Sequence, residues 1–303
     1  MIGYRNEHTI ASTCEVVGRG YWSGQSIRVR FLPASAGTGI VFVRTDLPGH
    51  PQCPARIDFA DSVQFRTNLH NGEACFAMVE HLMAALAGLE IDNCVVETDA
   101  EEMPGLDGSS DAYVGALQSA GLVIQAALKQ QLVIDRPMSV RQGDACIEVN
   151  PCEDMRSHYG YRLDYGTASV IPKQSFQFDL TPRQFSRQVA AARTFVTLEQ
   201  AQQLRAGGIA KHVSNQELLV IGEDGPVENQ FRYRNECARH KTLDLIGDLS
   251  LVGVDLIGRF VSERGGHRLN GMLAQKLSQM LAHSATPHNM FAPQATQKTR
   301  RAA

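Results

Sequence analysis

Two kinds of hydrophobic periodicity alternate along this chain. Residues 27–31 and 40–46 carry apolar side chains at alternating positions, which predicts an opening antiparallel sheet with one buried face. Residues 79–89 follow a helical spacing instead, and a strand pattern returns over residues 91–98. A second helix is expected over residues 111–122. Strands and helices in this irregular order predict an α+β fold rather than a regular βαβ winding.

The second half of the chain has a similar succession. A polar stretch without a strand pattern covers residues 125–131, and beyond it we expect a strand pair, two helices, a strand and a last helix. These elements are expected at about residues 132–149, 199–205, 236–253, 255–263 and 269–283. Since both halves place helices against a sheet, the pattern favours a duplicated fold of two similar layered domains.

The length of 303 residues corresponds to two domains of about 150 residues each. We place the boundary in the polar stretch, which gives a first α+β domain at residues 1–126 and a second at residues 127–283. Residues 284–303 contain two prolines, a basic end and no periodicity, so we expect a flexible tail.

Charge and composition argue against several classes of protein. Lys and Arg total 29 against 32 Asp and Glu, and the net charge of -3 offers no bulk positive field for nucleic acid or anionic lipid. No apolar stretch approaches the roughly 20 residues that a membrane helix needs. Residues 1–6 lack the pattern of a signal peptide. We therefore expect a cytoplasmic protein with no transmembrane segment and no nucleic-acid partner.

The seven cysteines are odd in number and scattered, and they contain no Cys-x-x-Cys pair. This argues against a disulfide framework and against a thiolate zinc finger. We expect most of them to be small buried apolar residues. The cysteines are Cys14, Cys53, Cys75, Cys94, Cys146, Cys152 and Cys237.

Glu80 and His81 stand at the start of the otherwise apolar helix expected at residues 79–89. Adjacent helical side chains point about 100° apart, so both can border a cleft only near a helix end. One could then bind a metal while the other contacts its water. Alternatively, Glu80 stabilises the helix N-terminus through the dipole and His81 is an ordinary core residue.

His240 and Asp244 lie four residues apart in a helical pattern, so they share one face and could chelate one ion. Asp248 lies a further turn along that face, and a surface ion pair is the alternative reading. With His81, these side chains make three ligands and leave a fourth position open, as in a catalytic zinc site. His267 stands in a glycine-flanked turn, where it is either exposed to solvent or a catalytic group.

Such a site would hydrolyse an amide or an ester. Zinc lowers the pKa of bound water and polarises a carbonyl. Glu80 could take the proton of the water, and His267 could protonate the leaving amine or stabilise the tetrahedral intermediate.

Five segments of the chain resemble motifs of the UDP-3-O-acyl-N-acetylglucosamine deacetylase family, the zinc amidases of lipid A synthesis. They are VEHLMAALAGLEIDN (79–93), LDGSSDAYV (106–114), RTF (193–195), RHKTLDLIGDL (239–249) and GGHRLNG (265–271). The resemblance extends from about residue 9 to about residue 281. It implies two layered α+β domains with the active site between them and a hydrophobic passage for the acyl chain.

The resemblance also implies a role for each matched residue. Zinc, with iron(II) as a possible substitute, would be bound by His81, His240 and Asp244. Glu80 would be the general base and His267 the general acid or electrostatic stabiliser. Asp248 would orient the ring of His267, and Thr194 would donate to the oxyanion. A UDP-linked acylated amino sugar would be contacted by Lys241, Arg264, Tyr165, Phe195 and Asp107.

Several segments depart from the family pattern. Trp22, in GYWSG (20–24), replaces a family histidine, and Met78 stands where a threonine is common. The segment HVSNQELLV (212–220) replaces a glycine-rich one, and the loop at 106–114 lacks the usual proline-phenylalanine. Because these changes gather around substrate contacts, two alternatives stay open: a diverged amidase acting on another acylated amine, and a non-catalytic metal-binding homologue.

Overall fold

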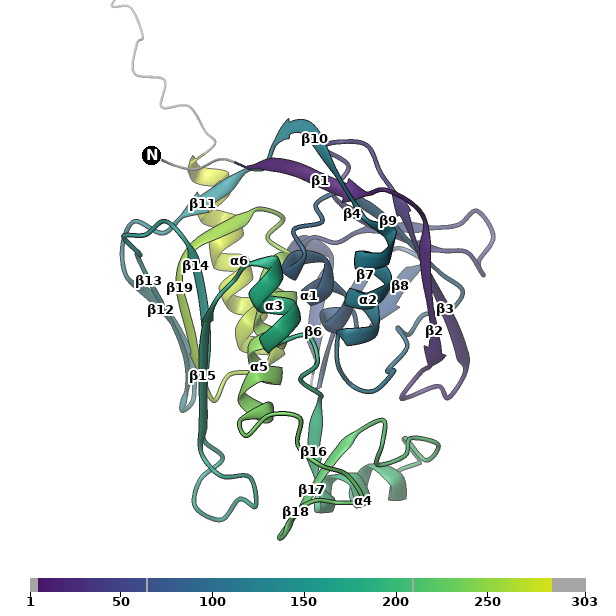
Figure 1. Ribbon diagram of the computed structural model, residues 1–303, viewed down its shortest axis with the longest axis vertical. Helices are drawn as coiled ribbons and strands as arrows, with labels where there is room; N and C mark the ends of the chain where they lie inside the picture. Colours follow the sequence, from purple (N-terminus) through teal and green to yellow (C-terminus); the bar gives the residue numbers. More distant parts are fainter. Residues whose placement is uncertain (1–4, 64, 209, 285–303) are drawn as a thin grey trace, which may run out of the picture.

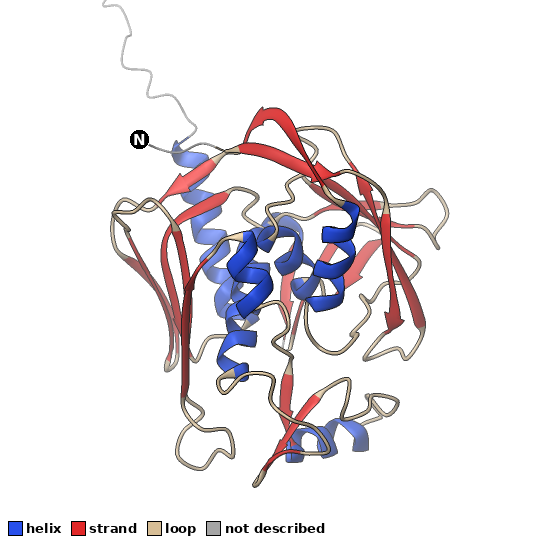
Figure 2. Ribbon diagram, in the orientation of Figure 1, coloured by secondary structure: helices blue, strands red, loops and turns tan. Residues whose placement is uncertain are grey.

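Two sheets enclose a layer of helices in the computed structural model, which describes residues 5–63, 65–208 and 210–284 (Figures 1 and 2). Strands and helices are mixed without regular βαβ winding, so the α+β fold class predicted from the sequence is confirmed. The tail expected at residues 284–303 lies, apart from Ser284, outside the described residues.

The first sheet is built by the N-terminal half of the chain. Its spatial order is β2 (Cys14–Arg19), β3 (Ser26–Pro33), β9 (Cys94–Thr98), β4 (Ile40–Arg44) and β5 (Gln52–Pro54). The expectation that residues 27–31 and 40–46 open one antiparallel sheet as neighbours is wrong, because β9 lies between β3 and β4. The central strand β9 runs antiparallel to β3 and parallel to β4.

The second sheet has the same plan. Its spatial order is β12 (Met138–Gln142), β13 (Ala145–Asn150), β19 (Asp255–Glu263), β14 (Ser157–Leu163) and β15 (Gln174–Asp179), with β11 (Gln131–Val133) also paired to β19. The central strand β19 runs antiparallel to β13 and parallel to β14. Two sheets with one strand order and one set of directions support the duplicated fold expected from the sequence.

Helices precede and follow the central strand of each sheet. These helices are α1 (Glu80–Gly88) and α2 (Asp111–Ala120) around β9, and α5 (Glu236–Ser250) and α6 (His267–Ser284) around β19. Helix α1 packs against α5 and is buried on almost every side, which explains why its sequence is apolar all round. Helix α2 ends two residues before the expected position, because Gly121 adopts a left-handed φ of 74°.

Each half carries an insertion before its first central helix. The first insertion is a small sheet of β6 (Ala60–Val63), β7 (Arg66–Asn71) and β8 (Ala74–Ala77), preceded by the short 3-10 helix η1 (Ile57–Phe59). The second contains α3 (Pro182–Gln188), β16 (Phe195–Thr197), α4 (Leu198–Ala206), β17 (Leu219–Gly222) and β18 (Gly225–Pro226). Figure 1 shows α4 and β16–β18 projecting at one end of the molecule.

The polar stretch at residues 125–131 was expected to lack strand structure, and this expectation is wrong. Strand β10 (Leu122–Leu128) pairs antiparallel with β1 (Asn6–Ile10) and covers most of it. The proposed domain boundary at residue 126 therefore falls within a strand and stays a prediction. Within the described part of the chain, every helix is too short or too polar to cross a bilayer.

Candidate active site

Three helix ends or faces bring the candidate catalytic side chains together. Glu80 and His81 are the first two residues of α1, and His240 and Asp244 lie one turn apart on α5. His267, which we expected in a turn before the last helix, is the first residue of α6. All five side chains are buried and border one cavity. Helix starts thus place polar groups at the edge of an apolar layer.

The side chains of His81, His240 and Asp244 form a compact set of potential metal ligands. Their ligand atoms all lie within 4.8 Å of one another. Asp244 Oδ1 is 3.2 Å from His240 Nε2 and 3.6 Å from His81 Nε2, yet this buried oxygen has no hydrogen-bond partner. Since a buried carboxylate oxygen without a partner is costly, the arrangement fits a cation bound between the three atoms.

A second hydrogen bond fixes the orientation of one of these imidazoles. His240 Nδ1 lies 3.1 Å from the carbonyl oxygen of Ala192, which accepts the Nδ1 proton and leaves Nε2 as the free ligand atom. Burial lowers the pKa of His240 to about 3, so its ring is neutral. Neutral imidazole is the form that binds metal.

Asp244 is ionised although it is buried. Burial raises the pKa of this carboxyl, but its interactions with His240, Lys241 and His267 outweigh burial and hold the pKa well below its usual range. The Lys241 ammonium donates to Asp244 Oδ2 at 2.6 Å. An anionic carboxylate beside a neutral imidazole is the donor set that zinc prefers.

His267 is held by a chain of buried hydrogen bonds. Its Nδ1 lies 2.9 Å from Asp248 Oδ2, and Asp248 also accepts hydrogen bonds from Thr67 Oγ1 at 2.6 Å and from Asn270 Nδ2 at 2.8 Å. Burial disfavours the charged imidazole, but the carboxylates of Asp248, Asp244 and Glu80 overcome it and raise the pKa of His267 to about 9. The ring is therefore a proton donor at neutral pH.

Glu80 borders the same cavity, where it could accept a proton. Burial raises the pKa of its carboxyl, with the charges of His267 and His81 acting in the opposite direction. The backbone N–H of Thr67 donates to Glu80 Oε2 at 3.0 Å and fixes the side chain. A carboxylate of raised pKa and an imidazolium thus border the same cavity as the three ligands, an arrangement suited to general acid–base chemistry.

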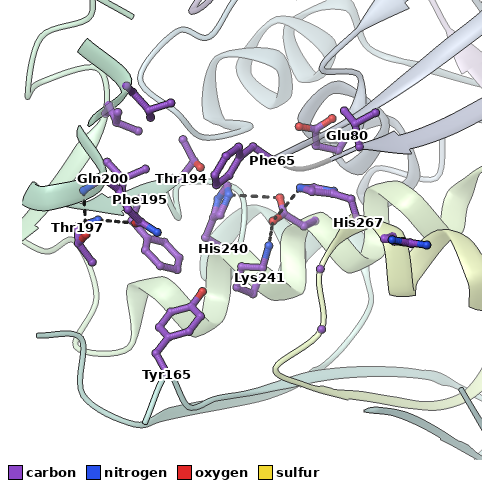
Figure 3. Close-up of a pocket in the computed structure, with 18 of the residues that line it drawn as sticks. Phe65, Glu80, Tyr165, Thr194, Phe195, Thr197, Gln200, His240, Lys241 and His267 are labelled. Atoms are coloured by element: carbon purple, nitrogen blue, oxygen red, sulfur yellow. Dashed lines mark hydrogen bonds and ion pairs between the residues drawn. The ribbon is translucent and has the colours of Figure 1, made fainter. Parts of the chain in front are cut away.

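The cavity around these residues has a volume of about 1350 Å³. Figure 3 shows Glu80 and His267 at one end, His240 and Lys241 in the middle, and Thr197 and Gln200 at the other end. Apolar side chains also line the cavity, most of them from the two insertions: Val63, Phe65, Met78, Phe195, Val196, Leu204, Ala210 and Leu218. The cavity therefore combines polar, titratable groups with a partly apolar wall.

The proposed substrate contacts fall into two groups. Lys241, Arg264, Tyr165 and Phe195 line the cavity, and the last two have ring centroids 6.3 Å apart. The proposed oxyanion donor Thr194 lines it as well. Asp107 is not among the residues that line it. Its carboxylate accepts a hydrogen bond from Ser109 Oγ at 2.7 Å and pairs with Arg232 at 2.6 Å.

Reasoning from the sequence missed two residues that support the site. Thr67 lies 181 residues from Asp248 in the chain, and nothing in its own surroundings indicates that contact. Asn270 follows His267 by three residues on the same helix, so their shared contact with Asp248 could have been inferred from helical spacing.

The two segments that depart most from the family pattern meet over the cavity. His212 Nε2 is 2.8 Å from the carbonyl oxygen of Gly20, and the Tyr21 hydroxyl donates to the carbonyl oxygen of Glu217. Trp22 lines the cavity, with the Arg66 guanidinium 4.8 Å from its ring centroid. The two segments that differ from the family pattern are far apart in the sequence, but they contact each other in the fold.

Comparison with known proteins assigns the family. A sequence model of the UDP-3-O-acyl N-acetylglycosamine deacetylase family matches residues 7–279. A UDP-3-O-acyl-N-acetylglucosamine deacetylase of Trichormus variabilis is 40% identical over 276 residues, covering 89% of this chain and 98% of the relative. The proteins of this name from Anaeromyxobacter sp. and Brucella ovis are 37% and 36% identical, covering 90% and 89% of this chain and 89% and 94% of the relatives. The chain therefore belongs to the UDP-3-O-acyl N-acetylglycosamine deacetylase family.

Proposed function

We propose that this protein is a zinc-dependent deacetylase of lipid A biosynthesis. It would hydrolyse the N-acetyl amide of UDP-3-O-(3-hydroxyacyl)-N-acetylglucosamine to the free amine and acetate. The observation that carries this proposal is the unpartnered, buried Asp244 Oδ1 facing His81 Nε2 and His240 Nε2, with Glu80 and His267 bordering the same cavity. A zinc ion held by these three side chains would supply Lewis acidity at the amide carbonyl.

The side chains around the ligand set divide the proton transfers between them. Glu80 accepts a proton from the attacking water as the new carbon–oxygen bond forms. His267, protonated and held by Asp248, donates its proton to the amide nitrogen as the carbon–nitrogen bond breaks. Thr194 lines the cavity, where its hydroxyl would donate to the developing oxyanion.

The shape of the cavity supports an acylated nucleotide sugar as the substrate. Lys241 and Arg264 offer positive charge in the cavity for the diphosphate, and Tyr165 and Phe195 offer aromatic faces for stacking. The apolar part of the cavity lining suits the 3-O-acyl chain, because burying its methylene groups contributes about 0.8 kcal/mol each.

One observation favours a second candidate, a diverged amidase that acts on another acylated amine. Both segments that depart from the family pattern meet at the His212–Gly20 contact, and Tyr21, Trp22 and Leu218 from them line the cavity. A change of substrate would be expected to alter this wall rather than the metal ligands.

Release of acetate tests both candidates. Purified protein is assayed with UDP-3-O-(3-hydroxyacyl)-N-acetylglucosamine and with N-acetylated amines that lack the nucleotide, before and after chelation and after zinc is restored. The proposal predicts chelator-sensitive release from the UDP-sugar, regained with zinc. Metal-dependent release from another amine alone would favour the diverged amidase, and release that is unaffected by complete removal of metal would contradict zinc dependence.

A further inference from the structure

A second group of potential metal ligands lies at the turn between β13 and β14. Cys152 Sγ, Asp154 Oδ1 and His158 Nε2 are all within 4.8 Å of one another, and we call these three residues the Cys152 cluster. His158 is paired with Arg259 in β19, whereas the end of β19 at Glu263 leads to His267. The Cys152 cluster therefore lies toward the opposite end of this sheet from the candidate active site.

The three side chains converge on one carboxylate oxygen. The Cys152 thiol donates to Asp154 Oδ1 at 2.9 Å, and His158 Nε2 lies 2.9 Å from the same oxygen. The backbone N–H of Arg156 lies 3.2 Å from that oxygen and 3.3 Å from Cys152 Sγ. Thiol and imidazole protons thus occupy the position that a shared cation would take.

A carboxylate outside the cluster orients the imidazole. His158 Nδ1 lies 2.8 Å from Asp179 Oδ1 on the neighbouring strand β15. Metal-binding histidines almost always donate their other ring proton to a carboxylate or carbonyl group, which fixes the tautomer and directs the free nitrogen at the ion. The His158–Asp179 bond provides this orientation, as Ala192 does for His240.

The donor set indicates which ion fits. A thiolate beside an imidazole and a carboxylate suits zinc and its neighbours, whereas magnesium and calcium prefer oxygen alone. An aspartate carboxylate such as that of Asp154 is ordinarily anionic at neutral pH. The Asp154 side chain is 47% exposed, which gives water access to a fourth coordination position.

We propose that Cys152, Asp154 and His158 bind a second zinc ion through Sγ, Oδ1 and Nε2, with water as the fourth ligand. Binding releases the thiol proton to solvent and forms a zinc–sulfur bond in its place, while the imidazole proton is carried on Nδ1, toward Asp179, so that Nε2 is free to bind. The ion cross-links the turn at residue 152 to strand β14. This site is independent of the proposed deacetylase function, because none of its ligands lines the active-site cavity.

Cobalt(II) is the probe that separates the two sites. The candidate active site offers only nitrogen and oxygen ligands, so thiolate-to-cobalt charge-transfer absorption in the near ultraviolet would report the Cys152 cluster. The metal-stripped full chain is titrated with cobalt(II), alongside Cys152→Ser and the control Cys75→Ser. Cys75 is a suitable control because it is also half-buried beside a histidine, with His70 Nδ1 3.2 Å from its sulfur.

The expected result is a saturable charge-transfer band that is lost in Cys152→Ser and is kept in Cys75→Ser. Asp179→Asn keeps all three ligands but weakens the orienting bond, so it should reduce cobalt affinity by about 10- to 100-fold. No band in the unmodified chain, or a band that survives Cys152→Ser, would overturn the proposal. An unchanged affinity in Asp179→Asn would overturn the role of Asp179.

Alkylation of thiols gives an independent readout with zinc itself. Bound zinc should slow the modification of Cys152 by roughly tenfold or more, since the reactive thiolate is held by the metal. Modification of Cys75 should be unaffected in the same sample. Equal rates at Cys152 with and without saturating zinc would contradict the site even if deacetylase activity is normal.

Discussion

Gly247 of α5 meets Glu80 of α1 backbone to backbone: a Cβ placed on Gly247 would lie 2.1 Å from the carbonyl oxygen of Glu80. Only glycine permits this approach. Because Glu80 precedes His81 and Gly247 follows Asp244 by three residues, the contact sets the distance between the ligand of one helix and the ligands of the other. The two halves of the chain thus make a close backbone contact beside the residues that build the site.

Gly247→Ala should therefore push α1 and α5 apart. We expect a loss of about 1–3 kcal/mol in the free energy of unfolding, the usual cost of overpacking, together with weaker zinc binding. Gly115→Ala is the matched control, because Gly115 lies in α2 and a Cβ added there would meet no heavy atom within 4 Å. It should be stabilising by about 0.5–1 kcal/mol. Urea denaturation measures the free energy of unfolding of both variants. Equal changes in Gly247→Ala and Gly115→Ala would refute the argument from close approach.

Glu80→Gln separates catalysis from metal binding. The amide can still accept the hydrogen bond from Thr67, but it cannot take a proton, so turnover should fall by about 100-fold or more if Glu80 is the general base. Zinc content should not change. Asp244→Ala is the contrasting variant, since it should lose zinc affinity as well as activity. Near-normal turnover in Glu80→Gln would remove Glu80 from the mechanism.

Arg193 and Glu236 form a buried ion pair behind the cavity wall. Their side chains are 4% and 0% exposed, with Arg193 Nε 2.7 Å from Glu236 Oε1. Arg193→Ala leaves Glu236 unpaired and should cost about 3–5 kcal/mol of unfolding free energy. Arg30→Ala, which breaks the more exposed pair with Glu97, should cost at most about 1 kcal/mol. Similar losses in the two variants, measured by urea denaturation, would contradict this account.

Acid should destabilise the fold partly through Asp92. Burial opposes its ionisation, but Arg5 and Lys129 outweigh burial and lower the pKa of this carboxyl. A carboxyl whose pKa is lower folded than unfolded adds stability above the unfolded value of about 3.9, and that stability is lost as pH falls through the folded pKa. Asp92→Asn should therefore flatten the decline in unfolding free energy below about pH 4, whereas the exposed Asp224→Asn should not.

The parts of the site that were predictable from the sequence depend on local geometry. His240 and Asp244 share a helix face because they are four residues apart, and the structure places them one turn apart on α5. The start of an apolar helix at Glu80 also follows from local pattern. Local pattern does not predict that these residues meet His267, because no local rule brings three separate helices to one point.

The errors have a physical cause in tertiary contacts. Strand β10 exposes Ile124 and Leu128 and, among the described residues, pairs with β1 alone, so its sequence lacks the alternation of a strand with one buried face. The insertion of β9 between β3 and β4 is likewise set by pairing between distant segments. Thr67 reaches Asp248 only because the first insertion folds against α5 and α6, and no periodicity encodes that contact.

The central claim is that His81, His240 and Asp244 hold the metal that serves deacetylation. Anomalous diffraction at the zinc absorption edge from zinc-saturated crystals tests it most directly. We predict a peak about 2.0–2.2 Å from His81 Nε2, His240 Nε2 and an Asp244 carboxylate oxygen. Zinc-saturated crystals with no peak at these three side chains would contradict the account.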